Sequence, residues 1–212
     1  MILIQDKLSI VLVGSFNPAI LTPQWIARNA LGVEAGENIQ VQMIAPVVGF
    51  GAMPQYSFNG ITYTPSFQNV TFLLANLDVQ GREHVATTIA AILEQLPHTP
   101  VVGLGFNFGF TVTTPTETLL NLLSPSGELA ESFPDGATTV GRNWGNTLEW
   151  GNSIVSVQSQ LDNEVVSVDV NFHHNVTSAN EARELIIEPN SYAKYYDAAL
   201  LAIQGLTNQQ LE

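Results

Sequence analysis

The sequence predicts an α+β domain with a largely antiparallel sheet and helices packed on one face. Strand-like runs follow one another through hairpin turns instead of alternating strictly with helices. A long amphipathic segment at residues 79–96 and a helical stretch at residues 178–204 supply the helices. At 212 residues the chain is long enough for one substantial core, so we expect a single domain over residues 1–212.

The first element expected is a strand over Ile2–Phe16, which is apolar on both faces like the central strand of a sheet. Asn17-Pro18 ends it, because proline cannot donate to a ladder and restricts the residue before it. Thr22 then offers an N-cap oxygen, and Pro23 fits the first position of a short helix that Gly32 terminates.

An antiparallel meander is expected next, with strands over residues 38–48, 60–64 and 69–77. Asn59-Gly60 carries the signal of a two-residue hairpin between the chain before it and the second of these strands. The apolar residues of segment 79–96 follow helical spacing, and Pro97 stops this helix.

Residues 101–112 give the clearest strand pattern. The side chains at Val102, Leu104, Phe106, Phe108, Phe110 and Val112 point one way, and the other face carries Gly103, Gly105 and Gly109. Glycines along one face predict that a helix or an aromatic ring lies close to the sheet there. They lie in mid-strand instead of at a strand-to-helix turn, so they do not form a dinucleotide-binding loop.

The second half begins with a capping box, Thr114 to Glu117, which predicts a short helix ending at Leu123. Residues 124–146 read as a surface loop, followed by strands over 148–159 and 165–173 that form a hairpin around Asp162-Asn163. A second capping box, Ser178 to Glu181, opens a helical region to about residue 204 that Pro189 interrupts. Its tyrosines at 192, 195 and 196 are expected to pack on the sheet.

The composition excludes several classes of function. The net charge is −13, yet only 12% of residues are charged and only six are Lys or Arg. So few cations make direct nucleic-acid binding improbable, and a poorly charged surface suits a chain that packs against another protein or copies of itself. The absence of cysteine excludes disulfides and thiolate metal sites and fits a cytoplasmic protein. No apolar run is long enough for a membrane span, so we expect a soluble chain.

The best candidate site is a set of polar residues that share one face of the late strand: Ser167, Asp169, Asn171 and His173. A solvated sheet face, a partner-binding face and a metal or acid-base site are the three readings of this set. Asp169 and His173 lie roughly 13 Å apart along a strand, so they cannot chelate one ion without a bend. We therefore predict no catalytic residue, no metal site and no cofactor.

Two further groups are candidates for partner binding. Trp144 and Trp150 lie among Gly and Asn residues and are either exposed recognition aromatics or part of the core. Glu181, Glu184 and Glu188 fall on one side of a helix and form either a wet helix face or a docking surface for a basic partner.

Three fragments together resemble an uncharacterised family of bacterial α+β proteins of similar length. They are Phe16-Asn17-Pro18-Ala19-Ile20 followed by Pro23 and Trp25; His98-Thr99-Pro100 followed by Gly105 and Asn107; and Asn171 with His173. The family has no established activity, so the resemblance implies a fold and not a function.

The sequence thus predicts a non-enzymatic interaction or assembly protein, with another protein or copies of itself as partner. One alternative is an immunity- or inhibitor-type protein that binds a basic target through Glu181, Glu184 and Glu188. The other is a metal-dependent hydrolase that uses Asp169 and His173, with Asp162 or Glu164 as a further group.

Overall fold

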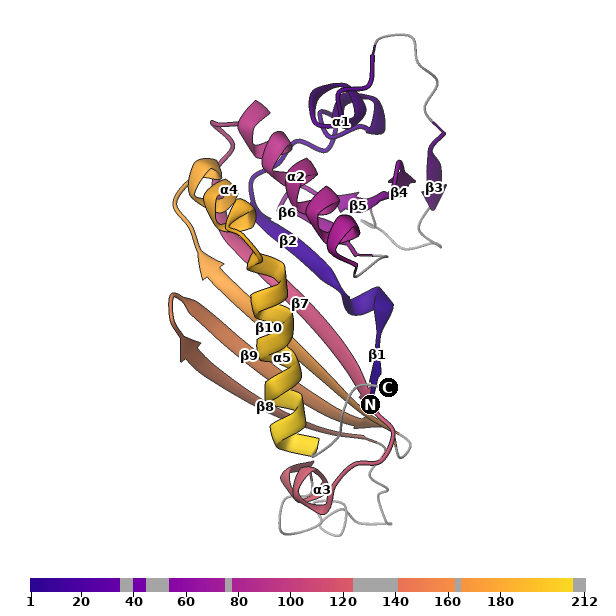
Figure 1. Ribbon diagram of the computed structural model, residues 1–212, viewed down its shortest axis with the longest axis vertical. Helices are drawn as coiled ribbons and strands as arrows, with labels where there is room; N and C mark the ends of the chain where they lie inside the picture. The colour runs from indigo at the N-terminus through magenta and orange to yellow at the C-terminus, as the bar shows by residue number, and fades with distance from the viewer. Residues whose placement is uncertain (35–39, 45–53, 75–77, 124–140, 163–164, 208–212) are drawn as a thin grey trace, which may run out of the picture.

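The structure is a computed structural model that describes residues 1–34, 40–44, 54–74, 78–123, 141–162 and 165–207. A ten-stranded antiparallel sheet carries helices α2, α4 and α5 on one face, as Figure 1 shows. The predicted α+β class with helices packed on one face is confirmed. The remaining helices join the same layer, since α1 contacts α2 and α3 contacts α5.

The elements alternate irregularly between strands and helices along the chain. In order they are β1 (Ile2–Leu3), the 3-10 turn η1 (Gln5–Lys7), β2 (Ser9–Gly14), α1 (Pro23–Asn29), β3 (Gln42–Ile44), β4 (Gln55–Phe58), β5 (Ile61–Pro65), β6 (Asn69–Leu73), α2 (Val79–Gln95), β7 (Val101–Val112), α3 (Glu117–Leu123), β8 (Gly141–Trp150), β9 (Ser153–Asp162), β10 (Val165–Asn175), α4 (Ala179–Ile187) and α5 (Ser191–Thr207).

The strand order is β3-β4-β5-β6-β2-β7-β10-β9-β8, and β1 pairs with β7 beside η1. Strand β7 lies at the centre, between β2 and β10, and every pairing is antiparallel. Within the described chain β3 and β8 form the two edges of the sheet.

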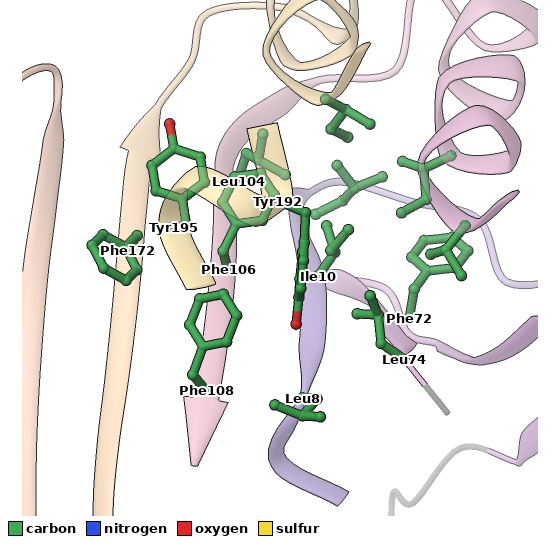
Figure 2. Close-up of a cluster of buried hydrophobic side chains, with 14 of the residues drawn as sticks. Leu8, Ile10, Phe72, Leu74, Leu104, Phe106, Phe108, Phe172, Tyr192 and Tyr195 are labelled. Carbon is green, nitrogen blue, oxygen red and sulfur yellow. The ribbon is translucent and has the colours of Figure 1, made fainter. Parts of the chain in front are cut away.

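The core lies between β7 and α5, where the ring-bearing face of the strand meets the tyrosines of the helix (Figure 2). Phe106 stacks on Tyr195 with 4.5 Å between ring centroids, and Phe108 lies 5.1 Å from Tyr192. Both phenylalanines are at most 1% exposed. Burying aromatic side chains removes the largest apolar areas from water, so this layer dominates the stability of the fold.

Two local predictions are confirmed at atomic detail. The Thr22 hydroxyl accepts a bond from the Trp25 amide at 3.3 Å, which caps α1 with Pro23 in its first turn. The turn between β4 and β5 has φ of 47° at Asn59 and 75° at Gly60, as a type I′ hairpin requires.

Two predicted strands are interrupted. The strand expected over residues 2–16 is broken by η1, so that β1 and β2 both pair with β7 but on separate stretches of it. The strand expected over residues 148–159 turns back at Gly151, whose φ is 61°, and becomes two antiparallel strands, β8 and β9.

The surface loop predicted over residues 124–146 is wrong for residues 141–146, which belong to β8, and residues 124–140 lie outside the described chain. The predicted cap at Thr114 is also wrong, because α3 begins at Glu117 and the Leu119 amide bonds the hydroxyl of Thr116 at 3.2 Å. Val102, expected within the ring face, is 57% exposed because the register with β2 shifts at Val13 and Gly14.

Three predictions fall partly on residues outside the described chain. Of the strand expected over 38–48 the structure describes β3 at 42–44, and residues 38–39 and 45–48 are not described. The strand expected over 69–77 ends at Leu73, and residues 75–77 are not described. The β9–β10 turn includes residues 163 and 164, which are also not described, while both flanking strands have the predicted antiparallel pairing.

No helix among the described segments is both long enough and apolar enough to cross a membrane.

Candidate functional site

The face of the sheet opposite the helices is the open face of the molecule. In the strands that carry it, every second residue points away from the buried core, and these residues bear mainly hydroxyl and carboxamide groups. Within the described chain no α-helix lies on this side. We call this surface the open face. On the central strands its exposed or partly exposed residues are Asn107, Ser167, Asp169, Asn171, His173, Ser156 and Gln158, and Ser9 points the same way but is buried.

Strand β10 supplies the predicted row of Ser167, Asp169, Asn171 and His173. All four are partly exposed, whereas the alternate residues Val166, Val168, Val170 and Phe172 are buried in the core. The predicted separation of the two faces is therefore confirmed. His174, the next residue, points to the core side and is 1% exposed.

The glycines of β7 make room for this row. In the antiparallel register Asp169 pairs with Gly109 and His173 with Gly105. A Cβ at Gly103 would lie 2.7 Å from Cε1 of His173, and one at Gly109 would lie 2.5 Å from Cβ of Lys7. The close approach expected at these glycines is found, but the groups that approach are side chains of β10 and η1, not a packed helix. The glycines thus let neighbouring polar side chains lie flat across β7.

A line of hydrogen bonds crosses three strands in the middle of the open face. Asn171 on β10 donates from Nδ2 to Oδ1 of Asn107 on β7, and Asn107 donates to Oγ of Ser9 on β2 at 3.0 Å. The three residues are directly opposite one another in the strand registers. Because each carboxamide is held by a neighbour, its orientation is fixed.

The ion pair between Lys7 and Asp169 lies next to this line. Nζ of Lys7 donates to both carboxylate oxygens of Asp169, at 2.8 and 2.7 Å. Both side chains are half exposed, so the pair contributes little to stability. It does neutralise the charge of Asp169, and the centre of the open face therefore carries no net charge.

The open face also contains a shallow depression over Gly145 of β8. Its volume is about 410 Å³, and its lining includes Gln158, Gln160, Asn143 and Asp169. The missing side chain at Gly145 creates the hollow, and carboxamide groups surround it. Such groups donate and accept hydrogen bonds with equal ease, which suits neutral polar ligands or peptide groups.

The two titratable residues of the row are each in contact with a neighbouring side chain. Asp169 is engaged by Lys7, and the ring of His173 lies 3.3 Å from Oδ1 of Asn175. In the described segments no group of three or more His, Asp, Glu or Cys side chains could hold a metal ion. Glu164, one of the groups considered for a metal site, lies outside the described chain.

His174 lies behind the open face, against Tyr195 and Phe106. Burial lowers the pKa of His174, and the charges of His173 and Lys194 lower it further. Neither ring nitrogen makes a well-formed hydrogen bond within the described chain, although the backbone of Asn152 lies close enough to favour the charged form. His174 is therefore a neutral residue that packs against aromatic rings in the core.

The two tryptophans lie on the helix side of the sheet, away from the row on β10. Trp144 is half buried, and its cross-strand partner is Ser159, which faces the core. Trp150 packs against Phe172 and Tyr195, and the ammonium of Lys194 lies 5.7 Å from its ring centroid. Trp150 remains 42% exposed although it packs on the core, and its role in recognition stays a prediction.

The three glutamates lie on α4 and at its C-cap, also on the helix side. Glu181 accepts bonds from the amide and the hydroxyl of Thr177, which lower its pKa. Glu184 accepts a bond from Asn180, and Glu188 is exposed. The nine candidate residues are therefore not one surface: four lie on the open face and five on the helix side.

Sequence reasoning missed the partners of the β10 row. Lys7, Ser9 and Asn107 are far from it in sequence, and only the register between strands brings them together. A weak signal was present in Asn107, the one long polar side chain among the glycines of its strand face.

Comparison of the sequence with models of known protein families and with curated proteins gives no match. The resemblance to a bacterial α+β family therefore stays a prediction, and the case for a function depends on the geometry of the open face.

Proposed function

We propose that this chain is a non-enzymatic interaction protein, a subunit or accessory factor that binds another protein through its open face. The observation that carries the proposal is the polar line Ser9–Asn107–Asn171, fixed by hydrogen bonds across three strands on a side that no described α-helix covers. Ser9 is buried and anchors the line, while Asn107 and Asn171 are partly exposed. The lack of cysteine supports a cytoplasmic setting.

The chemistry of the open face favours a neutral polar partner. Lys7 is paired with Asp169, and the neighbouring strands present serine, threonine, asparagine and glutamine. A surface of this kind lacks the cations needed for phosphate backbones. It can bind a protein by hydrogen bonds whose geometry is set in advance, which reduces the entropic cost of association.

The test compares one substitution on opposite sides of the molecule. Gln158→Lys places a cation on the open face, and Gln95→Lys places the same group on the exposed end of α2. Each purified variant is used to capture partners from the native lysate, and the complexes are sized by light scattering. We expect a partner that wild type and Gln95→Lys retain and Gln158→Lys loses. Equal capture by both variants contradicts the role of the open face.

The hydrolase alternative receives no specific support. Its two best residues, Asp169 and His173, are each held by another group on the same face. Metal analysis of the purified protein and the variant His173→Ala decide the matter: bound metal with an activity that this variant loses would replace the proposal.

The immunity-type alternative requires the glutamates of α4 to be available to a basic target. Glu181 is bound by Thr177 and Glu184 by Asn180, so a partner must compete with existing bonds at two of the three positions. Binding that weakens steeply with salt, and that Glu184→Gln and Glu188→Gln reduce, would favour this alternative.

A further inference from the structure

Strand β8 is the outer edge of the sheet on the β10 side. It pairs with β9 over all ten of its residues, and no other described strand pairs with it (Figure 1). From Gly145 to Trp150 every residue is exposed, on both faces of the strand. The edge is thus long and extends beyond the cover of α5.

The hairpin at Gly151 determines which backbone groups point outward. Trp150 and Ser153 close a two-residue turn, and the pair that closes such a turn is hydrogen-bonded across it. The even-numbered residues of β8 therefore direct their N–H and C=O groups to β9. The odd-numbered residues Asn143, Gly145, Thr147 and Glu149 direct theirs to the outside.

Several of the features that usually protect an edge strand are absent from β8, although it carries the charged residues Arg142 and Glu149. β8 contains neither proline nor lysine, and its pairing with β9 has no bulge. On its helix side Leu148 is 48% exposed and Trp150 42% exposed. Edges of this kind pair with another strand when one is available.

We infer that β8 pairs with β8 of a second copy of this chain, antiparallel about a twofold axis at Asn146. This inference rests on the proposed function and names one partner within it. A twofold axis perpendicular to the sheet keeps both helix layers on the same side. Even-numbered residues then face even-numbered residues of the second copy, and odd-numbered residues face odd-numbered ones. Trp144 lies opposite Leu148 of the second copy, and Gly145 lies opposite its Thr147.

The register follows from self-complementarity. Centring the pair on Gly145 instead would place Trp144 opposite an asparagine and leave Leu148 opposite Arg142. The Asn146 register places Trp144 opposite Leu148 and Arg142 opposite the ring of Trp150 on the helix side, and it forms about eight backbone hydrogen bonds between the outward-facing groups.

Charge favours this edge over other surfaces for self-association. Each chain has a net charge of −13, so two copies repel wherever acidic groups meet. β8 has one arginine and one glutamate, and the register places Glu149 opposite the neutral Asn143 of the second copy. The pairing also joins two open faces into one continuous surface for a further partner.

The first experiment removes one outward donor. Thr147→Pro deletes an N–H that points away from β9, and Thr147→Val keeps it while changing the same side chain. Sedimentation velocity from 1 to about 500 µM should show a reversible dimer for wild type and Thr147→Val, and a dissociation constant at least tenfold higher for Thr147→Pro. Wild type that remains monomeric throughout, or Thr147→Pro that dimerises like wild type, overturns the inference.

The second experiment uses the absence of native cysteine. Asn146→Cys places two thiols at the axis, in a non-hydrogen-bonded pair with about 4.5 Å between Cα atoms, within disulfide range. Asn143→Cys, the same change on the same strand, leaves its two thiols about 20 Å apart. We expect mild oxidation to cross-link the first variant and not the second. Equal cross-linking of both, or of neither, overturns the inference even if Thr147→Pro fails to fold.

The two proposals fail separately. If wild type is monomeric but captures a partner that Gln158→Lys loses, the β8 dimer is refuted and the proposed function stands. If the Asn146→Cys variant cross-links but wild type captures no partner, the dimer stands and the partner-binding role of the open face is refuted.

Discussion

Gly109 is the glycine on which the open face depends most. A Cβ there would lie 2.5 Å from both Cβ and Cδ of Lys7 and 3.1 Å from Oδ1 of Asp169. Cδ of Lys7 can move, but its Cβ is fixed to the backbone of η1. Gly109→Ala must therefore shift η1 or β7 and separate Lys7 from Asp169.

The expected cost combines two opposing effects. Overpacking of this kind destabilises by about 1–3 kcal/mol. Alanine in a strand interior recovers about 0.5–1 kcal/mol relative to glycine, mainly through the unfolded chain. The half-exposed ion pair adds at most about 1 kcal/mol when it is lost. Gly109→Ala should therefore lower the free energy of unfolding by about 1–2 kcal/mol.

Gly105→Ala is the matched control on the same strand face. The nearest atom to its new Cβ is Nδ2 of Asn171 at 3.4 Å, an ordinary contact distance. This variant should be neutral or about 0.5 kcal/mol more stable. The two variants should thus differ by about 2 kcal/mol, or several degrees in Tm for a chain of this size.

Urea unfolding followed by tryptophan fluorescence measures this difference. Lys7→Gly removes both clashing carbons, so Gly109→Ala should cost markedly less in that background than alone. If Gly109→Ala is as stable as Gly105→Ala, or if Lys7→Gly leaves its cost unchanged, the glycines do not serve to admit the Lys7 side chain.

Three further predictions concern local features. Burial lowers the pKa of His174 below 6.5, so as the pH falls the histidine binds a proton in the unfolded state before it does so in the folded state. The free energy of unfolding should therefore decrease below pH 6.5, and His174→Phe should reduce that decrease in urea titrations at several pH values. An unchanged pH profile would contradict this. Gly60→Ala should cost about 1 kcal/mol in the same assay, since φ there is 75°; a neutral result would mean that the hairpin changes its turn type. Ser178→Ala removes the oxygen that accepts the Glu181 amide and should cost about 1 kcal/mol, with Ser178→Thr close to wild type; equal stability of both variants would show that the cap is dispensable.

Periodicity predicted the faces of the sheet and failed where the chain changes direction. The alternation in β10, and in β7 beyond Val102, was read correctly because the ring or valine face of each strand lies against the core and burial enforces the period of two. The break at η1 was missed because residues 5–7 sit between apolar runs that read as one strand; Asp6 and Lys7 were the only sign of it. The Gly151-Asn152 turn carried a recognisable hairpin signal that the apolar runs on both sides obscured.

Strand β8 shows why an edge is difficult to predict. Beyond the helix layer neither face of a strand has to be apolar, so the alternation that identifies strands is weak. Its first residues read as part of a polar loop, although they pair with β9 along their whole length. The candidate site had a similar limit: the polar row on β10 was visible in the sequence, whereas Lys7 and Ser9 join it only through the pairing of β1, η1 and β2 with β7.

The distribution of the six cations decides how this surface can recognise a partner. Lys7 neutralises Asp169, Arg183 lies 3.5 Å from Glu94, and Lys194 lies over the rings of Trp150 and Tyr195. These three basic side chains are engaged within the molecule, and Arg28, Arg82 and Arg142 do not belong to the central strands of the open face. With Lys7 neutralised by Asp169, the centre of this face offers no charge of its own to guide a partner, so under the proposed function any long-range steering would come from the net charge of −13 on the whole chain. If the open face binds a partner as proposed, its affinity would come from the fit of fixed hydroxyl and carboxamide groups, and it would select a partner by shape more than by charge.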